Sequence, residues 1–253
     1  MMPLLTVILP AYNEAAHIGT ILERLVGVAL PSGGSMQILV VDDGSEDQTA
    51  QEVRRFMAAH PDVDMTLSES GRNQGKGAAI RSVLPMAKGK YTVIQDGDEE
   101  YHPEDLAMMV GLMMERGYGV LYGSRYLGGG RLRKSLYPTY YYGVRLLSVT
   151  TNLLYRQHIT DEATCYKMFT TPLLQSLPLR SRRFEFCPEV TALTALRGWK
   201  IPEVPIRYTP RSKEQGKKIR ALDGWQAWWV LVKMSWSSRK VKGEAKEDSK
   251  TEG

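Results

Sequence analysis

The chain has 253 residues, of which 43% are hydrophobic and 24% are charged, and its formal net charge is +5 at pH 7. This length fits one large domain, or one domain with a small appendage, and the composition is that of a globular protein that buries its own core. A fold held together by disulfides is excluded, because Cys165 and Cys187 offer one pair at most. The surplus positive charge favours anionic partners such as nucleotides, phosphates or an anionic membrane surface.

Several other classes of protein are excluded on similar grounds. Residues 1–14 predict a strand instead of a secretory leader, because they lack a basic start, a long apolar run and a small-residue cleavage site. No stretch reaches the roughly 18 to 20 apolar residues that a membrane span needs. Nothing resembles a nucleic-acid-binding module, so we expect no nucleic-acid partner. The cysteines are interpreted as small core residues in a reducing compartment.

In the first half of the chain, short apolar runs alternate with segments of helical periodicity. The apolar runs predict strands at residues 5–9, 38–41, 65–67, 91–94 and 120–122. The periodic segments predict helices at 18–26, from about 45 to 60, at 75–87 and from 103 to about 115. Ser45 is expected to cap the second of these helices with Gln48 as its reciprocal partner, and Pro103 to open the fourth. The alternation predicts an α/β fold: a Rossmann-like, mostly parallel sheet with helices on both faces.

The second half has a different character. Residues 128–145 are rich in glycine, then in basic and then in aromatic side chains. Helices are expected at 146–155 and 188–197, and strands at 165–169 and 201–208. An amphipathic helix is predicted at 222–236, and the charged residues 237–253, which are nearly free of apolar side chains, are expected to be disordered.

Polar clusters follow all five strands predicted in the first half, at residues 11–14, 42–45, 72–76, 95–100 and 123–125. In open parallel sheets, ligands bind beyond the carboxyl ends of the strands. We therefore expect the five clusters to converge on one crevice that binds a ligand.

The most informative cluster is the triplet Asp96-Gly97-Asp98, which follows the predicted strand 91–94. Two carboxylates separated by one residue at a strand exit provide hard oxygen ligands for Mg²⁺ or Mn²⁺, which share coordination with substrate phosphates. A triplet of this kind also arises by chance as a solvated acidic turn. The nearby Glu99, Glu100 and Glu104 add repulsion that a cation or solvent must compensate, and this favours a metal.

Three further clusters supply groups that suit a nucleotide. Asp42 is placed to accept hydrogen bonds from a base or a ribose, although the same stretch is also typical of a helix cap. Tyr12 offers a flat face to a base, and Glu14 an acceptor to a ribose. Arg72 and Lys76 supply positive charge in a glycine-containing loop that lacks the spacing of a P-loop.

Taken in order, the segments PAYNE (10–14), VDDGS (41–45), RNQGKG (72–77), QDGDEEYHPEDL (95–106) and GSRY (123–126) resemble family-2 glycosyltransferases. Within that family they resemble the dolichyl-phosphate mannose synthase-like, or polyprenyl-phosphate, group, from about Thr6 to Trp236. The resemblance implies a GT-A fold. It also implies inverting transfer of a sugar from a GDP- or UDP-sugar to a dolichyl or undecaprenyl phosphate, with Mg²⁺ or Mn²⁺ as cofactor.

The resemblance also implies roles for individual residues. Residues 1–125 would form the nucleotide-sugar-binding half of a domain spanning 1–236, and residues 126–220 the acceptor half. Expected contacts with the nucleotide-sugar come from Pro10, Tyr12, Glu14, Asp42, Asp43, Arg72, Lys76, Asp96, Gly97, Asp98 and Arg125. The expected metal ligands are Asp96, Asp98 and Glu100, although some relatives have glutamine in place of Glu100. Phosphates of donor or acceptor would be bound by Arg125, Arg211 and Lys218.

Two residues are expected to act in catalysis, Asp98 and Asp161. Asp161 lies in a segment that resembles the acidic stretch near the acceptor site of the family. It would act as a base toward a hydroxyl acceptor, or as a positioning residue, because a phosphate acceptor is already anionic near pH 7. A helix-capping role is a third interpretation. Glu185 and Glu189 are interpreted as structural polar contacts.

The predicted helix 221–236 carries Trp225, Trp229 and Trp236 at helical spacing beside Lys233, as in a helix that lies in a membrane interface. The alternative is that it packs on the core. The basic and tyrosine-rich residues 131–145 would add a second contact. We therefore expect a peripheral protein on the cytoplasmic face of a membrane, one that needs a membrane-spanning partner, or one that uses a soluble acceptor. A nucleotidyltransferase and a non-catalytic subunit are the alternatives from other classes.

Overall fold

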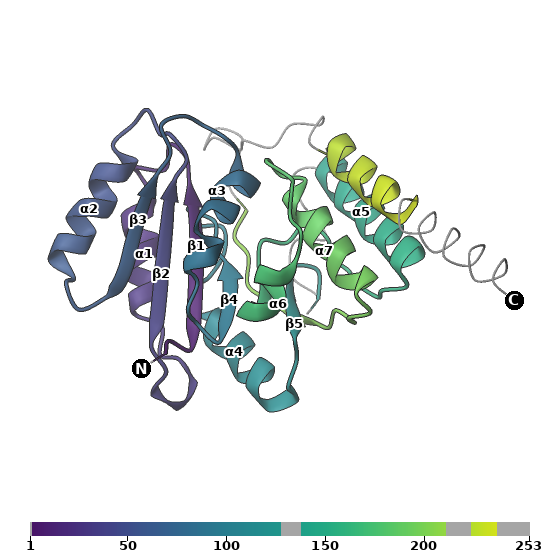
Figure 1. The fold of residues 1–253 in the computed structure, drawn as a ribbon, viewed down its shortest axis with the longest axis horizontal. Helices are drawn as coiled ribbons and strands as arrows, with labels where there is room; N and C mark the ends of the chain where they lie inside the picture. Colours follow the sequence, from purple (N-terminus) through teal and green to yellow (C-terminus); the bar gives the residue numbers. More distant parts are fainter. Residues whose placement is uncertain (1, 128–137, 211–223, 237–253) are drawn as a thin grey trace, which may run out of the picture.

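The computed structural model describes residues 2–127, 138–210 and 224–236 (Figure 1). Within these ranges seven strands form one sheet, in the order β3-β2-β1-β4-β6-β5-β7. The strands are β1 (Leu5–Ala11), β2 (Met36–Asp42), β3 (Asp64–Glu69), β4 (Tyr91–Ile94), β5 (Val120–Ser124), β6 (Lys167–Thr170) and β7 (Glu203–Pro205).

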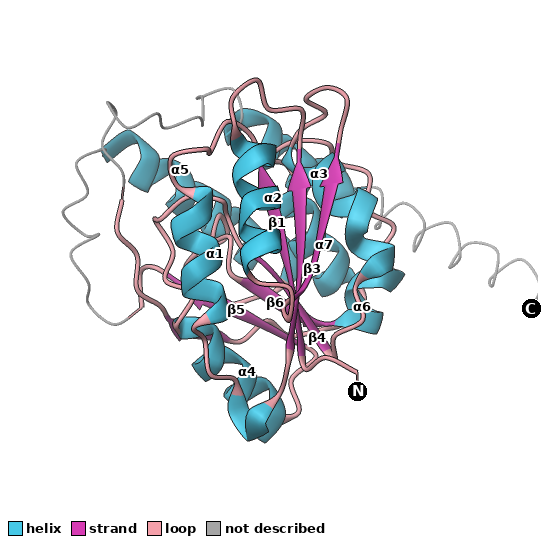
Figure 2. Cartoon of the chain, turned by 90° about the vertical axis from the view of Figure 1, so that its left-hand side faces the viewer, coloured by secondary structure: helices cyan, strands magenta, loops and turns pink. Residues whose placement is uncertain are grey.

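Helices cover both faces of this sheet, with α1 and α4 on one side and α3 and α6 on the other (Figure 2). The α-helices are α1 (Ile18–Val26), α2 (Thr49–Ala59), α3 (Lys76–Val83), α4 (Asp105–Arg116), α5 (Pro138–Tyr155), α6 (Thr171–Ser176) and α7 (Phe186–Leu196). Two short 3₁₀ helices are η1 (Pro31–Gly33) and η2 (Leu84–Met86), and residues 224–236 form a final helix.

The directions of the strands determine at which edge of the sheet each strand ends. β1 pairs in parallel with β2 along seven residues, from Leu5 opposite Met36 to Ala11 opposite Asp42, and also in parallel with β4. β6 runs antiparallel to both β4 and β5. Consequently β1, β2, β3, β4 and β5 all end at the same edge of the sheet, as the sequence predicts, and the mostly parallel α/β fold is confirmed.

The core follows the predicted periodicity. Val7, Ile8 and Leu9 of β1 are fully buried. On α1 the buried side chains are those of Ile18, Ile21, Leu22 and Leu25, which form the stripe that the i, i+3, i+4 spacing predicts. The central strands are buried on both faces, which explains their continuous apolar runs.

The predicted cap at Ser45 is wrong. α2 begins at Thr49, with Gln48 at the capping position and no side-chain cap. The Ser45 hydroxyl instead donates to Asp42 Oδ1 and accepts the backbone N–H of Asn13 at 2.9 Å. A carboxylate three residues earlier therefore holds the serine at the strand exit, where it cannot cap the helix.

Other boundaries also differ from prediction. α4 begins at Asp105, because Pro103 lies in a turn whose carbonyl accepts the N–H of Leu106. The predicted helix 75–87 ends at Val83 and continues as η2, which contains Pro85. α5 starts at Pro138, earlier than expected, and α6 was not predicted.

The final helix packs on the protein through one face. Ala227 and Leu231 are buried in a second apolar cluster with Leu147 and Tyr155 of α5 and Ala192 of α7. The Tyr155 hydroxyl also donates to the carbonyl of Leu231 at 2.5 Å. The interpretation that this helix packs on the core therefore holds for this face. The predicted disorder of 237–253 lies outside the described residues.

The opposite face of the same helix is solvent-exposed, with Trp225, Trp229 and Trp236 at 68%, 56% and 73% exposure. In the described ranges no helix is both long and apolar enough to cross a bilayer.

These two faces predict losses of stability of different size when their side chains are truncated. Leu231→Ala should lower the free energy of unfolding by about 2–5 kcal/mol, because it leaves a cavity in a packed cluster. Trp229→Ala, on the exposed face of the same helix, should change it by only about 0.5 kcal/mol. Urea unfolding followed by circular dichroism measures both, and equal losses would contradict the packing.

Candidate active site

The exits of β1, β2 and β4 lie against one another. The backbone N–H of Asn13 donates to Ser45 Oγ (2.9 Å), and Asn13 Oδ1 accepts the N–H of Glu46 (2.8 Å). A Cβ atom added at Gly97 would lie 3.5 Å from Glu14 Cγ and 3.6 Å from the Cβ of Ala11. The predicted nucleotide-binding and metal-binding motifs therefore meet at one place.

Asp43 holds a neighbouring loop against these strand ends through hydrogen bonds. Its two carboxylate oxygens accept the N–H groups of Gln74 (2.8 Å) and Gly75 (2.7 Å), and the side chain is buried. Gly75 has φ +98°, a conformation that favours glycine. Asp43 thus has a structural role that the sequence did not reveal, and its expected contact with a nucleoside stays a prediction.

Asp42 is better suited to a nucleoside. Its Oδ1 accepts the N–H of Ser45 at 3.2 Å and also the Ser45 hydroxyl. Its Oδ2 makes no hydrogen bond to any described residue. One carboxylate oxygen is thus held in place while the other remains available as an acceptor.

Asp96 pairs with the lysine that begins α3. Lys76 Nζ donates to Asp96 Oδ1, and its side chain is only 14% exposed. Burial opposes the charge on Lys76, but the neighbouring Asp96 outweighs it and raises the lysine pKa above its ordinary value. The structure therefore brings a cation and a predicted metal ligand into direct contact.

The remaining acidic residues of this turn also have partners within the protein. Glu104 accepts two hydrogen bonds from Arg24, which lower its pKa to about 2. The other pairs are Glu99 with His17 at 2.8 Å and Glu100 with the Tyr208 hydroxyl at 2.6 Å. These partners compensate part of the repulsion within the acidic cluster, so the repulsion does not by itself call for a metal.

The residues of the turn nevertheless fit a metal shared with a substrate. In the described part of the chain, no three His, Cys, Asp or Glu side chains are gathered to hold an ion by themselves. Asp96 and Asp98 supply two hard oxygen donors, which suits a cation that takes its other ligands from phosphates and water. Glu100 is oriented by Tyr208, so its role as a third ligand stays a prediction.

Asp161 and Arg125 form a buried ion pair. Asp161 is fully buried, and its oxygens accept Arg125 Nε at 2.7 Å and Nη2 at 2.8 Å, together with the backbone N–H of Arg125 at 3.0 Å. The guanidinium also lies 5.0 Å from the centre of the Tyr208 ring. This geometry favours the positioning role of Asp161 over that of a base. Contacts of Arg125 with phosphate stay a prediction, and Arg211 and Lys218 lie outside the described residues.

A second buried pair was not predicted. Lys167 Nζ lies 3.6 Å from Glu162 Oε1, donates to the carbonyl of Glu162 at 2.6 Å and sits 3.9 Å from the centre of the Tyr122 ring. Both side chains are buried, and burial raises the pKa of Glu162. No spacing rule reports this pair, because Lys167 belongs to a strand and Glu162 to the preceding turn.

Two further interpretations of single residues are confirmed. Glu189 accepts the N–H groups of Arg180 and Ser181 at 2.8 and 2.9 Å, which is a structural contact. Both cysteines are free, and Cys165 is buried in the core while Cys187 packs against it.

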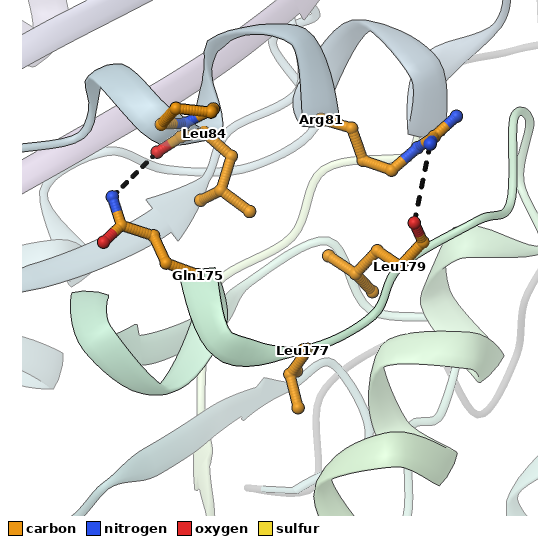
Figure 3. Close-up of a pocket in the computed structure, with 6 residues that line it drawn as sticks. Arg81, Leu84, Gln175, Leu177 and Leu179 are labelled. Atoms are coloured by element: carbon orange, nitrogen blue, oxygen red, sulfur yellow. Dashed lines mark hydrogen bonds between the residues drawn. The ribbon is translucent and has the colours of Figure 1, made fainter.

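A hollow elsewhere on the surface lies between α3 with η2 and the α6 region (Figure 3). In this hollow Gln175 Nε2 donates to the carbonyl of Leu84 at 3.0 Å, and Arg81 Nη1 to that of Leu179 at 3.5 Å. It lies beside the carboxyl end of α3, whereas Lys76 lies at the amino end. This hollow is therefore not part of the candidate active site.

Comparison with known proteins agrees with the geometry. The model of the family Glycosyl transferase family 2 matches residues 6–177, which is more than half of the chain. An uncharacterised protein of Methanocaldococcus jannaschii is 28% identical over 220 residues, which cover 84% of this chain and 85% of that protein. A dolichyl-phosphate beta-glucosyltransferase of Dictyostelium discoideum is 27% identical over 219 residues, which cover 81% of this chain and 66% of that enzyme.

Among solved structures, a mannosyltransferase from Pyrobaculum calidifontis in complex with GDP-Man and Mn²⁺ aligns with a TM-score of 0.59 and 20% identity. The alignment covers 97% of this chain and 76% of that one. This likeness concerns the fold, and it confirms the GT-A architecture that the motifs imply.

The buried pair of Asp161 and Arg125 generates a test of stability. Asp161→Asn should lower the free energy of unfolding by about 3–5 kcal/mol, because it leaves a buried guanidinium without its counter-charge. The exposed Asp62→Asn serves as the matched control and should be near neutral. Denaturant unfolding measures both variants, and a loss below about 1 kcal/mol at Asp161 would contradict a positioning role.

Proposed function

The chain belongs to glycosyl transferase family 2, and from this premise we propose that it transfers a sugar from a GDP- or UDP-sugar to a polyprenyl phosphate, with inversion at the anomeric carbon. The observation that carries the proposal is the position of Asp96 and Asp98 at the exit of β4, directly beside the exits of β1 and β2. This is the edge of the sheet where a nucleotide and its diphosphate would lie side by side.

In this proposal the β1 and β2 exits bind the nucleoside. The free Oδ2 of Asp42 would accept a hydrogen bond from the base or ribose, and Pro10, Tyr12 and Glu14 would line the same place. Support comes from the hydrogen bonds that tie residues 13, 45 and 46 together and so fix the two exits relative to each other. A preformed site of this kind loses little conformational entropy on binding.

Asp96 and Asp98 would hold Mg²⁺ or Mn²⁺ against the diphosphate. When bound, the metal supplies Lewis-acid stabilisation of the leaving nucleoside diphosphate. Lys76, already paired with Asp96, is placed to share the phosphate charge, and Arg72 lies in the same loop. The chain's own cations thus assist at the point where negative charge develops.

A phosphate acceptor fits the state of Asp161. A phosphate is anionic near pH 7 and attacks without a general base. Both oxygens of Asp161 are engaged by Arg125, which leaves the carboxylate poorly placed to take a proton. The name of the Dictyostelium relative, a dolichyl-phosphate beta-glucosyltransferase, supports the same class of acceptor.

A lipid acceptor requires contact with a membrane, and we infer that the chain binds the cytoplasmic face of one peripherally. The final helix exposes Trp225, Trp229 and Trp236 and lies alongside α5 (Figure 1). α5 itself exposes Leu146 at 54% and Leu153 at 75%. Tryptophan and leucine on exposed helix faces suit insertion at the boundary between headgroups and acyl chains, where nearby cations attract anionic lipids.

The reaction is tested by an assay of nucleoside diphosphate release, with a panel of GDP- and UDP-sugars, Mg²⁺ or Mn²⁺, and short-chain polyprenyl phosphate. Release should require the lipid and should be lost on chelation with EDTA. Asp98→Ala should lower the rate by roughly a hundredfold or more, because several kcal/mol of charge stabilisation are removed. The exposed Asp62→Ala is the matched control and should keep wild-type activity.

Other outcomes of this assay discriminate the alternatives. Release independent of lipid would indicate a soluble acceptor, and release of pyrophosphate would indicate a nucleotidyltransferase. No release with any donor would indicate a subunit that requires a membrane-spanning partner. Wild-type activity of Asp98→Ala at saturating metal would refute the assignment of the metal site.

Membrane binding is tested separately by cosedimentation with vesicles of phosphatidylcholine and phosphatidylglycerol. Replacing Trp225, Trp229 and Trp236 together by alanine should weaken binding by roughly tenfold or more, because the apolar area inserted into the interface is lost. Trp199→Ala removes a tryptophan that is 41% exposed outside this surface and should leave binding unchanged. Equal binding of the triple variant and the wild type would exclude this surface.

A further inference from the structure

Residues 180–183 form a segment whose backbone is unusually well anchored. The N–H groups of residues 180 and 181 donate to the buried Glu189 at 2.8 and 2.9 Å. Those of residues 182 and 183 donate to Glu185 Oε1 at 3.2 and 3.3 Å. Both carboxylates belong to the start of α7, so four consecutive amides are held by one helix end.

This anchored segment lies directly across the loop that Asp43 holds. The carbonyl of Arg182 accepts the N–H of Ala78 at 2.9 Å, in the first turn of α3. A Cβ atom at Gly75 would lie 2.5 Å from that carbonyl oxygen and 2.9 Å from Arg183 Cγ. The two segments therefore approach so closely that only glycine fits at position 75.

The segment carries two cationic side chains, those of Arg182 and Arg183. Arg182 and Arg183 are exposed, and their guanidinium groups make no hydrogen bond or ion pair with the described residues. Lys76, next to Gly75, pairs with Asp96 of the proposed metal site. The amino end of α3 adds its own partial positive charge to the same region.

We propose that Arg182 and Arg183 bind a phosphate group of the reactants at the rim of the active site. The inference rests on the proposed function for the identity of that phosphate. Guanidinium groups bind phosphate bidentately, and a rigid backbone lowers the entropy lost when they do so. The same chemistry is offered by two sources, the diphosphate of the donor and the phosphate of the lipid acceptor.

The test compares Arg182→Gln/Arg183→Gln with Arg180→Gln. Arg180 is exposed on the same segment and carries the same charge, but the atoms nearest to a Cβ at Gly75 belong to Arg182 and Arg183. Calorimetry at fixed ionic strength measures the Kd of GDP and UDP with Mn²⁺, and of a water-soluble short-chain polyprenyl phosphate. The double variant should bind one of these ligands roughly ten- to a hundredfold more weakly, as expected for lost charge-assisted hydrogen bonds. Arg180→Gln should stay within twofold.

The outcomes distinguish the donor diphosphate from the acceptor phosphate, and failure of this inference from failure of the proposed function. Weaker nucleotide binding identifies the donor diphosphate, and weaker lipid binding with unchanged nucleotide affinity identifies the acceptor. Partial recovery in Arg182→Lys/Arg183→Lys supports a charge contact. Affinities within twofold of wild type for both ligands, with an unchanged Tm, would overturn the inference. Because binding is measured without turnover, an absence of sugar transfer would refute the proposed function alone. If the wild type bound neither ligand, both proposals would fall.

Discussion

Parallel pairing of β1 with β2 on one side and with β4 on the other is the constraint on which the candidate site depends. It places residues 11–14, 42–45 and 96–100 at one edge of the sheet, although they are far apart in the sequence. Burial of the apolar side chains of these strands in the core offsets the conformational entropy that the chain loses in this arrangement. The polar turns that follow them carry the predicted site residues, some of which, such as Asp43, are buried and also hold the turns together.

Charged side chains lie near this edge at different depths in the protein. Buried or half-buried partners hold the acidic turn in place, with Arg24 on Glu104 and Lys76 on Asp96. Deeper in the protein, Arg125 and Asp161 satisfy each other without solvent. At the rim, Arg182 and Arg183 project from a backbone that is fixed by Glu185 and Glu189. Unlike these paired cations, Arg182 and Arg183 have no acidic partner among the described residues and leave positive charge at the rim, which is consistent with the net positive charge of the chain.

The final helix presents a different kind of surface. One face is packed through Leu231 against α5 and α7, and the other exposes tryptophans. Core packing therefore holds for one face of the helix, and the interpretation of the other face as a membrane interface stays a prediction. A helix that is anchored on one side and apolar on the other presents its exposed side chains in a fixed orientation, as a peripheral membrane contact requires.

The sequence by itself determined the class of fold, the five strand exits and the family, because strand and helix periodicities and the spacing within each motif are local properties. The order of neighbouring strands, the antiparallel direction of β6 and the length of α5 were decided by tertiary packing. Tertiary packing also decided which side chains became partners. Asp42 and Asp43 are adjacent and chemically identical in the sequence. Yet both carboxylate oxygens of Asp43 accept hydrogen bonds, from the N–H groups of Gln74 and Gly75, whereas Asp42 keeps one oxygen available as an acceptor. The sequence predicts Ser45 as a helix cap, yet its hydroxyl is bound by Asp42. It leaves Asp161 open as a base, a positioning residue or a helix cap, and the pairing with Arg125 favours positioning. For Asp43 and Asp161 the deciding partners lie 31 and 36 residues away in the chain, and a hydrogen bond between such distant residues leaves no periodic trace in the sequence.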